Sequence, residues 1–143
     1  LVEALQRSHE VAEVIDWSGE AARGRFLEGT GSLVIDAARG RVFACRSPRT
    51  DPALAAAWAA QMGLELVLFT ARGPEGRPIY HTNVVLCVGD GFVACGLDRI
   101  DPRERDAVAE RLAEGRARID LPIYSPRRGI ECTITACSSE VWP

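Results

Sequence analysis

Two stretches of the sequence, Val42-Phe43-Ala44-Cys45 and Phe92-Val93-Ala94-Cys95, are near copies that lie fifty positions apart (42 to 92). Each is the second of two short apolar runs separated by a turn that contains glycine, which is a signal for a β-hairpin. Each is followed by an Asp-Pro pair, Asp51-Pro52 or Asp101-Pro102, and these pairs have the same spacing. The sequence therefore predicts an internal repeat, and a repeat of about this length indicates an array of similar units.

The first repeat is expected to form a hairpin from residues 33–35 and 42–45, then a helix, then a closing strand over residues 65–69. The helix prediction depends on its ends. Asp51 can cap the helix, Pro52 suits the first helical position, and Gly63 suits the end of the helix.

The second repeat follows the same order. Residues 84–88 and 92–95 are expected to pair as a hairpin, Asp101-Pro102 to open a helix that stops at Gly115, and residues 118–121 to form the closing strand. The two units, about residues 28–69 and 81–123, predict an α/β fold built from repeated ββαβ units. Ahead of them, residues 1–15 are expected to form a short helix that runs into a strand, followed by a turn at residues 17–19.

The composition narrows the class of protein. A chain of 143 residues is long enough for one domain with a buried core. Its net charge of −3 argues against nucleic acid as a partner, and no apolar run is long enough to predict a membrane span. Five cysteines without a CxxC motif favour a cytoplasmic protein with reduced thiols over a disulfide framework or a zinc site. Cys45, Cys87 and Cys95 fall in predicted strands and are expected to be core thiols.

A polar segment, residues 77–83 (Arg-Pro-Ile-Tyr-His-Thr-Asn), leads directly into the apolar run at residues 84–88. A run of that kind without polar alternation is typical of a strand that is covered on both faces. Loops at the mouths of strands often carry binding and catalytic groups, so His81 and Asn83 are candidates for a site. Taken alone, His81 is explained equally well as a structural hydrogen-bonding residue.

Three motifs become recognisable when they are taken together in order: residues 26–32 (Phe-Leu-Glu-Gly-Thr-Gly-Ser), 47–50 (Ser-Pro-Arg-Thr) and 80–84 (Tyr-His-Thr-Asn-Val). They resemble the guanidino-group-modifying enzymes, which include arginine deiminases, dimethylargininases and amidinotransferases. Within this superfamily the chain looks most like the amidinotransferase-related hydrolases of the citrulline-utilisation type. The resemblance covers about residues 26–123. It implies a fivefold pseudosymmetric, pentein-type β/α propeller, of which residues 1–123 would form a part.

The resemblance also implies roles for individual residues. Glu28 would contact the guanidino or ureido end of the substrate, His81 would act as general acid and base, and Arg49 would help to bind the α-carboxylate. Thr30 and Asn83 would lie among the substrate-binding residues. The implied chemistry is covalent and needs neither a metal nor a cofactor: a cysteine thiolate attacks the planar carbon, an amine leaves, and water releases the product.

Physical chemistry agrees with these roles. A carboxylate is a natural receptor for the N–H donors of a guanidinium or urea, and an arginine fork matches a carboxylate. Histidine titrates near neutral pH, so it can give a proton to an amine and take one from water. Structural explanations stand beside these: Glu28 could satisfy loop amides, Arg49 could form a surface ion pair with Asp51, and Gly29 and Gly31 could serve only the geometry of a turn.

Asn83 bears on the substrate. Arginine deiminases usually carry an aspartate two residues after the equivalent histidine, whereas this chain has an amide there. An asparagine can donate a hydrogen bond to the carbonyl of a ureido group, and a carboxylate cannot. The hypothesis is a neutral, ureido-bearing amino acid as substrate, with citrulline hydrolysed to ornithine, ammonia and carbon dioxide. An activity on arginine or methylated arginine is the alternative within the superfamily.

The chain departs from the family pattern at both ends. The family's first module would precede Leu1, and its nucleophilic cysteine lies in a Gly/Ser-rich segment ending in Arg-Cys that nothing after Leu121 matches. Cys132 and Cys137 come too soon after the second unit to fill that role. We therefore expect a fragment that is inactive alone. Its tail, residues 124–143, does not match the family, and a truncated or frameshifted reading of the gene would produce such a tail.

Two other classes of function compete with the enzyme. The first is a non-catalytic binding protein on the same propeller fold, like the ribosome anti-association factors; such a scaffold has no need of Glu28, Arg49 and His81 together. The second is a metal site formed by His81 and nearby cysteines, which lacks ligand spacing. The expected partner is a small-molecule amino acid. Two units would also leave strand edges exposed, which favours association into a homo-oligomer.

Overall fold

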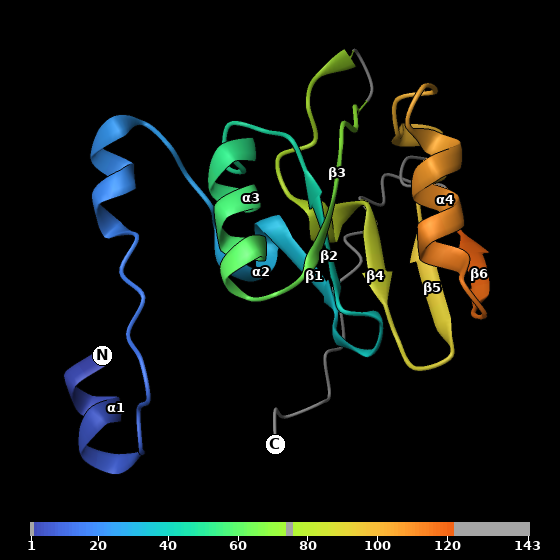
Figure 1. Ribbon diagram of the computed structural model, residues 1–143. Coiled ribbons are helices and arrows are strands. Elements are labelled where there is room, and N and C mark those ends of the chain that lie inside the picture. Colours follow the sequence, from blue (N-terminus) through green and yellow to red (C-terminus); the bar gives the residue numbers. More distant parts are fainter. Residues whose placement is uncertain (1, 74–75, 122–143) are drawn as a thin grey trace.

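The computed structural model describes residues 2–73 and 76–121. The first unit contains the strands β1 (Leu33–Asp36) and β2 (Arg41–Cys45), the helix α3 (Pro52–Gln61) and the strand β3 (Glu65–Phe69). Its sheet has the order β1-β2-β3, in which β1 and β2 are antiparallel and β2 and β3 are parallel (Figure 1). The change from antiparallel to parallel follows from the connections, because a short turn joins β1 to β2 and a helix joins β2 to β3.

The second unit repeats this arrangement. Strands β4 (Leu86–Val88) and β5 (Phe92–Cys95) form an antiparallel pair, helix α4 (Arg105–Ala113) follows, and β6 (Ala117–Asp120) lies parallel to β5. The prediction of a mixed α/β fold with ββαβ units is therefore confirmed. Neither three-stranded sheet closes on itself within the described residues. The predicted tail at residues 124–143 lies outside the described residues.

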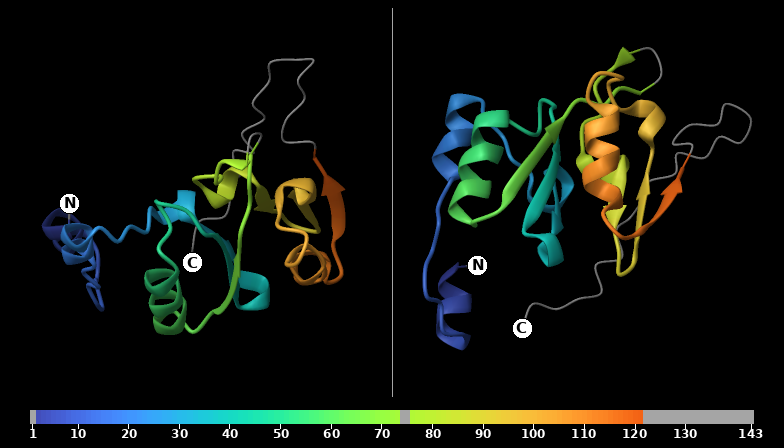
Figure 2. Two further views of the ribbon diagram at one scale, coloured as in Figure 1. Left: turned by 90° about the horizontal axis from the view of Figure 1, so that it is seen from above. Right: turned by 45° about the vertical axis from the view of Figure 1, so that its right-hand side comes forward.

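The units form alternating layers of sheet and helix. Helix α3 packs on β2 and β3, and α4 packs between β3 of the first sheet and strands β5 and β6 of the second (Figure 2). One core cluster, which includes Phe43, Phe69, Leu86 and Leu112, joins the two units, and a second cluster with Val42 and Ala55 lies under α3. Strands β1 and β4 also touch each other, and this contact brings the segments that precede them together.

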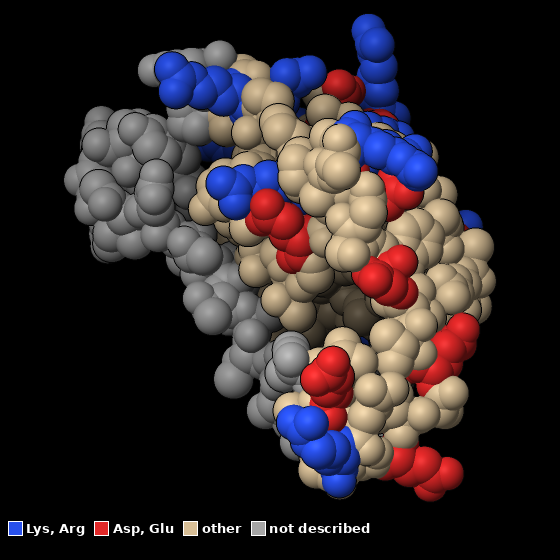
Figure 3. All heavy atoms as spheres, turned by 90° about the vertical axis from the view of Figure 1, so that its left-hand side faces the viewer, with Lys and Arg blue, Asp and Glu red and all other residues tan. Residues whose placement is uncertain are grey.

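The remaining elements are short helices and helical turns. They are α1 (Val2–Ser8), η1 (Ser18–Arg23), α2 (Gly29–Ser32), η2 (Ala37–Arg39), η4 (Thr82–Val84) and η5 (Leu97–Arg99). Helix α1 has no buried residues and lies apart from the two units (Figure 1). No helix in the described part of the chain has the length and apolar character needed to cross a membrane. On the face drawn in Figure 3, acidic and arginine side chains are interspersed.

Three local predictions are wrong. No strand follows α1, because residues 9–17 form no β-bridge and are almost entirely exposed. The strand expected from Val84 begins only at Leu86, because residues 82–84 form the turn η4, held by the buried hydroxyl of Thr82. The second helix begins at Arg105 rather than at the Asp-Pro pair.

The late start of α4 has a physical cause in its capping groups. In α3, the carboxylate of Asp51 accepts hydrogen bonds from the amides of Ala53 and Leu54, both at 2.9 Å. At the corresponding position, the carboxylate of Asp101 accepts from one amide, that of Arg103, at 3.0 Å. With a single amide satisfied, residues 102–104 form turns, and the regular helix follows them.

Candidate functional site

Three segments that are distant in the sequence meet where β1 and β4 touch. Glu28 immediately precedes α2, Arg49 lies between β2 and α3, and His81 immediately precedes η4. The turns α2 and η4 are in contact with each other. The fold thus brings side chains from positions 28, 49 and 81 into one cluster, which we call the Glu28 cluster.

The carboxylate of Glu28 is the centre of this cluster. The Nε2–H of His81 donates to Oε2 of Glu28 at 2.7 Å. The Nη1 group of Arg49 reaches both oxygens of the same carboxylate, at 3.1 Å and 3.3 Å. The side chain of His81 is 21 % exposed, that of Glu28 is 38 % exposed and that of Arg49 is 55 % exposed, so all three are open to a small molecule.

The electrostatics of the cluster keep Glu28 ionised. The hydrogen bond from His81, and then the one from Arg49, hold the pKa of the Glu28 carboxyl below its usual value. Both partners favour the charged form of the acid, which is the physical cause of a lowered pKa. Glu28 is therefore an acceptor at neutral pH, and it keeps its charge to a lower pH than an ordinary glutamate does.

A network of buried hydroxyl groups fixes the three segments behind the cluster. Ser32, Thr50 and Thr82 are fully buried. The amide of Glu28 donates to Oγ of Ser32 at 2.9 Å, and the Ser32 hydroxyl donates to the carbonyl of Arg49 at 2.7 Å. The hydroxyl of Thr50 donates to Oγ of Ser32 at 2.8 Å. One serine thus ties the segment of Glu28 to the segment of Arg49.

Thr82 ties the third segment to the other two. Its hydroxyl donates to the carbonyl of Ser32 at 2.5 Å and accepts from the amide of Cys45 at 2.7 Å. Both bonds are buried, where an unpaired polar group would be costly. The position of His81, the preceding residue, is consequently defined by contacts to α2 and β2 rather than by its own strand.

Two further residues shape the surroundings of His81. A Cβ atom added to Gly31 would lie 2.9 Å from Cε1 and Nε2 of the imidazole, so only glycine leaves room for the ring there. On another side, the ring of Tyr80 lies 4.6 Å from that of His81, centroid to centroid, and the guanidinium carbon of Arg49 lies 5.8 Å from the Tyr80 centroid. Tyr80 is therefore in contact with both partners of Glu28.

The other two predicted site residues do not join the cluster. Thr30 is exposed in α2, and Asn83 is half-buried in η4. Neither side chain hydrogen-bonds to Glu28, Arg49 or His81 in the described structure. The structure thus brings Glu28, Arg49 and His81 into direct contact and leaves Thr30 and Asn83 at the margin.

Sequence reasoning missed the residues that hold this geometry. Ser32, Tyr80 and Thr82 belong to the recognised motifs, but no position-specific role was predicted for them. The available signal was the hydroxyl pattern: Ser32 stands directly before a predicted apolar run and Thr82 stands two positions before one, where a buried hydroxyl needs a partner. Gly31 was expected only as a turn residue, and its role as the neighbour of an imidazole requires the fold.

The described cysteines are remote from nucleophilic chemistry. Cys45, Cys87 and Cys95 are free and buried, as predicted for core thiols. Burial raises the pKa of Cys45 to about 11 and that of Cys95 to about 12. Because the thiolate is the reactive form, these thiols stay unreactive at neutral pH. Within residues 2–73 and 76–121, no three His, Cys, Asp or Glu side chains are grouped so that they could hold a metal ion.

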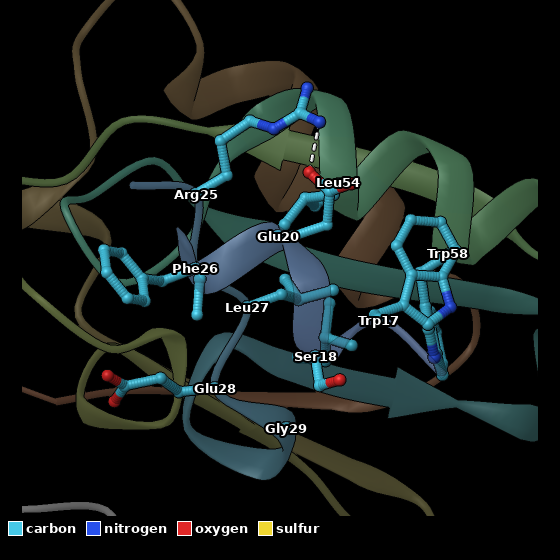
Figure 4. A pocket seen from close by; sticks show the side chains of 12 residues that line it. Trp17, Ser18, Glu20, Arg25, Phe26, Leu27, Glu28, Gly29, Leu54 and Trp58 are labelled. Atoms are coloured by element: carbon cyan, nitrogen blue, oxygen red, sulfur yellow. Dashed lines mark ion pairs between the residues drawn. The ribbon is translucent and has the colours of Figure 1, made fainter. Parts of the chain in front are cut away.

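A hollow of about 280 Å³ lies beside Glu28, between the segment that includes η1 and helix α3. In Figure 4, Phe26 and Glu28 stand at one side of it, and Trp17 and Trp58 stand together at the other; Arg25 and Glu20 form an ion pair above it. Neither His81 nor Arg49 lines this hollow. The hollow therefore adjoins the Glu28 cluster through Glu28 alone.

Comparisons with known proteins show the family and the fold of this chain. The family model for eukaryotic N,N dimethylarginine dimethylhydrolases matches residues 1–128 of this chain. None of the curated proteins matches it. Among solved structures, the substrate-bound mutant N-terminal domain of ArgZ, an arginine dihydrolase from the ornithine-ammonia cycle in cyanobacteria, is similar with a TM-score of 0.59 and 15 % identity.

A second similar structure is a mutant of AgrE in a binary complex with L-arginine, with a TM-score of 0.61 and 16 % identity. The ArgZ match covers 85 % of this chain and 42 % of that domain, and the AgrE match covers 85 % of this chain and 17 % of that one. This chain therefore spans less than half of the proteins it resembles. At these identities the likeness shows the fold alone.

Proposed function

Since the chain belongs to the N,N dimethylarginine dimethylhydrolase family, we propose that the protein that carries it is a hydrolase. It would hydrolyse the guanidino or ureido group of an arginine-derived amino acid. The family lies within the guanidino-group-modifying superfamily that the motifs of the sequence predicted. The observation that supports this most directly is the 2.7 Å contact between His81 and Glu28 with Arg49 on the same carboxylate. A carboxylate with an imidazole and a guanidinium beside it suits a substrate with N–H donors at one end and a carboxylate at the other.

In this proposal each residue of the Glu28 cluster has a separate task. The carboxylate of Glu28 accepts hydrogen bonds from the N–H groups of the substrate. His81 protonates the leaving amine and then takes a proton from the attacking water. Arg49 contributes to binding the α-carboxylate, and Thr30 and Asn83 complete the substrate contacts from the margin of the cluster.

The nucleophile in the proposed reaction is a cysteine thiolate that none of the described cysteines supplies. Cys45, Cys87 and Cys95 are all buried within strands, and burial raises the pKa of each thiol. The thiolate would add to the planar carbon, an amine would depart with a proton from His81, and water would cleave the covalent intermediate. The units described here would then be part of a pentein-type β/α propeller, consistent with two ββαβ units of the same topology.

We propose citrulline as the substrate. Asn83 offers a donor for the ureido carbonyl at a position where arginine deiminases usually have an aspartate. Hydrolysis would yield ornithine, ammonia and carbon dioxide. A second candidate is an N,N-dimethylated arginine, which the match to the dimethylarginine dimethylhydrolase family favours; arginine itself is a third, since AgrE was solved with it.

The test is to assay the whole protein that carries this chain on citrulline, arginine and N,N-dimethylarginine, and to measure ammonia and amino-acid products. Fastest turnover of citrulline supports the proposal. Faster turnover of either guanidino substrate overturns the interpretation of Asn83 while leaving the hydrolase in place. Absence of turnover on all three favours a non-catalytic binding protein of the same fold.

The role of His81 is tested in the same assay. Replacing His81 with Ala removes the proposed proton transfer, and kcat is expected to fall by a factor of roughly 10² to 10⁴. His9, the other histidine, is exposed, and its ring hydrogen-bonds to Ser8. It serves as the control, so His9→Ala should leave kcat unchanged. A His81→Ala variant with wild-type kcat would contradict the assigned role.

A further inference from the structure

The proposed receptor carboxylate already holds a guanidinium, and that guanidinium belongs to the protein. Nη1 of Arg49 lies within 3.3 Å of both oxygens of Glu28. A guanidino substrate on Glu28 would present the same kind of group to the same acceptors. Arg49 and a guanidinium substrate therefore require the same oxygens of Glu28. The proposed function by itself requires only that Glu28 accept hydrogen bonds, and it does not address this overlap.

The charge of the cluster also matters for selectivity. The single negative charge of Glu28 is balanced by the positive charge of Arg49. Protonation of His81 would make the cluster net positive. Within the described residues, no other carboxylate forms a hydrogen bond or ion pair with Arg49 or His81. A cationic substrate thus meets a site with no net negative charge, and a neutral one meets no such penalty.

The position of Arg49 is built into the fold. Its amide donates to Oγ of Ser47 at 3.1 Å, and its carbonyl accepts from the buried hydroxyl of Ser32 at 2.7 Å. The Ser47 hydroxyl in turn donates to the carbonyl of Tyr80 at 2.6 Å. The guanidinium lies over the Tyr80 ring, an arrangement that attracts a cation. The hydrogen bonds of its own amide and carbonyl, together with the Tyr80 ring, therefore hold Arg49 beside Glu28.

We infer that Arg49 determines the substrate class, because by neutralising Glu28 it selects neutral ureido groups and disfavours guanidinium cations. This inference rests on the proposed function, and it adds a role to Arg49 beyond contact with the α-carboxylate. The two roles make different predictions. Loss of a contact to the α-carboxylate weakens citrulline and arginine equally, because both carry that group, whereas loss of the neutralising charge favours arginine only.

The decisive quantity is the ratio of kcat/KM for arginine to kcat/KM for citrulline, measured in the whole protein. Arg49→Met keeps the length of the aliphatic chain and removes the charge, and we expect this ratio to rise roughly tenfold or more, which corresponds to about 1.4 kcal/mol. Arg49→Lys retains the positive charge and should keep the ratio near that of the wild type. Arg103→Met, at an exposed position with no hydrogen bond or ion pair to the Glu28 cluster in the described structure, is the matched control.

A second measurement removes the α-carboxylate from the comparison. Methylguanidinium and methylurea carry no carboxylate, so their binding, measured by calorimetry, reports only on the Glu28 end. The inference is supported if Arg49→Met prefers methylguanidinium over methylurea more strongly than the wild type does. An unchanged preference overturns it. Calorimetry needs no turnover, so it decides the inference even if the assay overturns the proposed hydrolase.

Discussion

Gly31 and His81 are closer to each other than any side chain at position 31 would allow. The distance of 2.9 Å from a hypothetical Cβ to the imidazole is shorter than real Cβ contacts, so an added methyl must displace the ring. The backbone of Gly31 has no left-handed φ, which means that alanine at this position meets only the imidazole and no backbone strain. Since His81 is partly exposed, its ring has room to move outward.

Gly31→Ala should therefore damage the site and spare the fold. The displaced imidazole loses its 2.7 Å contact with Glu28, and kcat is expected to fall by roughly 10²-fold, the scale of a misplacement of about 1 Å. Gly19→Ala is the matched control, because nothing lies within 4 Å of its added Cβ. Steady-state kinetics and thermal unfolding of both variants check this. If Gly31→Ala retained wild-type kcat, the close packing would have no functional consequence.

At the scale of elements, Thr82 joins α2, β2 and η4 with one hydroxyl group. It donates to Ser32 and accepts from Cys45, and both partners are backbone groups in the buried interior. This arrangement converts residues 82–84 from the start of a strand into a turn. The turn places His81 at its entrance, facing the segment of Glu28.

Thr82→Val tests this junction with nearly unchanged side-chain volume. The substitution leaves the amide of Cys45 and the carbonyl of Ser32 buried without partners, and we expect a loss of about 1–3 kcal/mol in the free energy of unfolding for each unsatisfied group. Thr82→Ser retains the hydroxyl and should recover most of that loss. Urea denaturation of the three proteins provides the comparison, and equal stabilities for the valine and serine variants would rule out the hydroxyl as the cause.

At the scale of the whole molecule, the two units are joined by a buried ion pair. Nη1 and Nη2 of Arg116, before β6, contact the two carboxylate oxygens of Asp36, at the end of β1, at 2.5 Å and 2.6 Å. The side chains are 6 % and 1 % exposed. Arg41, also nearly buried, extends this junction to Glu114 at 3.0 Å and to the carbonyl of Arg111 at 2.8 Å.

Removal of one member of this pair should weaken the junction between the units. Asp36→Ala leaves the Arg116 charge buried without a partner, and the expected loss of stability is about 3–5 kcal/mol. Removing both charges with Asp36→Leu and Arg116→Met together should cost much less, because no unpaired charge remains.

The exposed pair Arg118–Asp120 provides the contrast, because its side chains are 39 % and 57 % exposed. Asp120→Ala is expected to change stability by less than about 1 kcal/mol. Chemical denaturation measures all of these variants in the whole protein. A loss for Asp36→Ala no larger than that for Asp120→Ala would mean that the buried pair does not join the units.

Local patterns in the sequence were sufficient for most of the fold. The hairpin runs, the capping aspartate and the glycine stops act over a few residues, so β3 was predicted with its observed bounds and Asp51 was correctly predicted to cap α3. The repeat predicted a second unit with the topology of the first, and the structure confirms it. The residues of the candidate site came from motif resemblance, and their roles remain predictions.

Contacts between distant residues account for what the patterns could not predict. The sequence offered Asp51, two positions away, as the ion-pair partner of Arg49, and it did not predict a pair with Glu28. In the fold, the amides of α3 occupy Asp51, and the guanidinium turns to Glu28, 21 positions away. Strand β4 starts late because Thr82 bonds to groups 37 and 50 positions away. Propensity and periodicity describe a chain and its near neighbours, whereas the partners of a charge or a buried hydroxyl are chosen by packing.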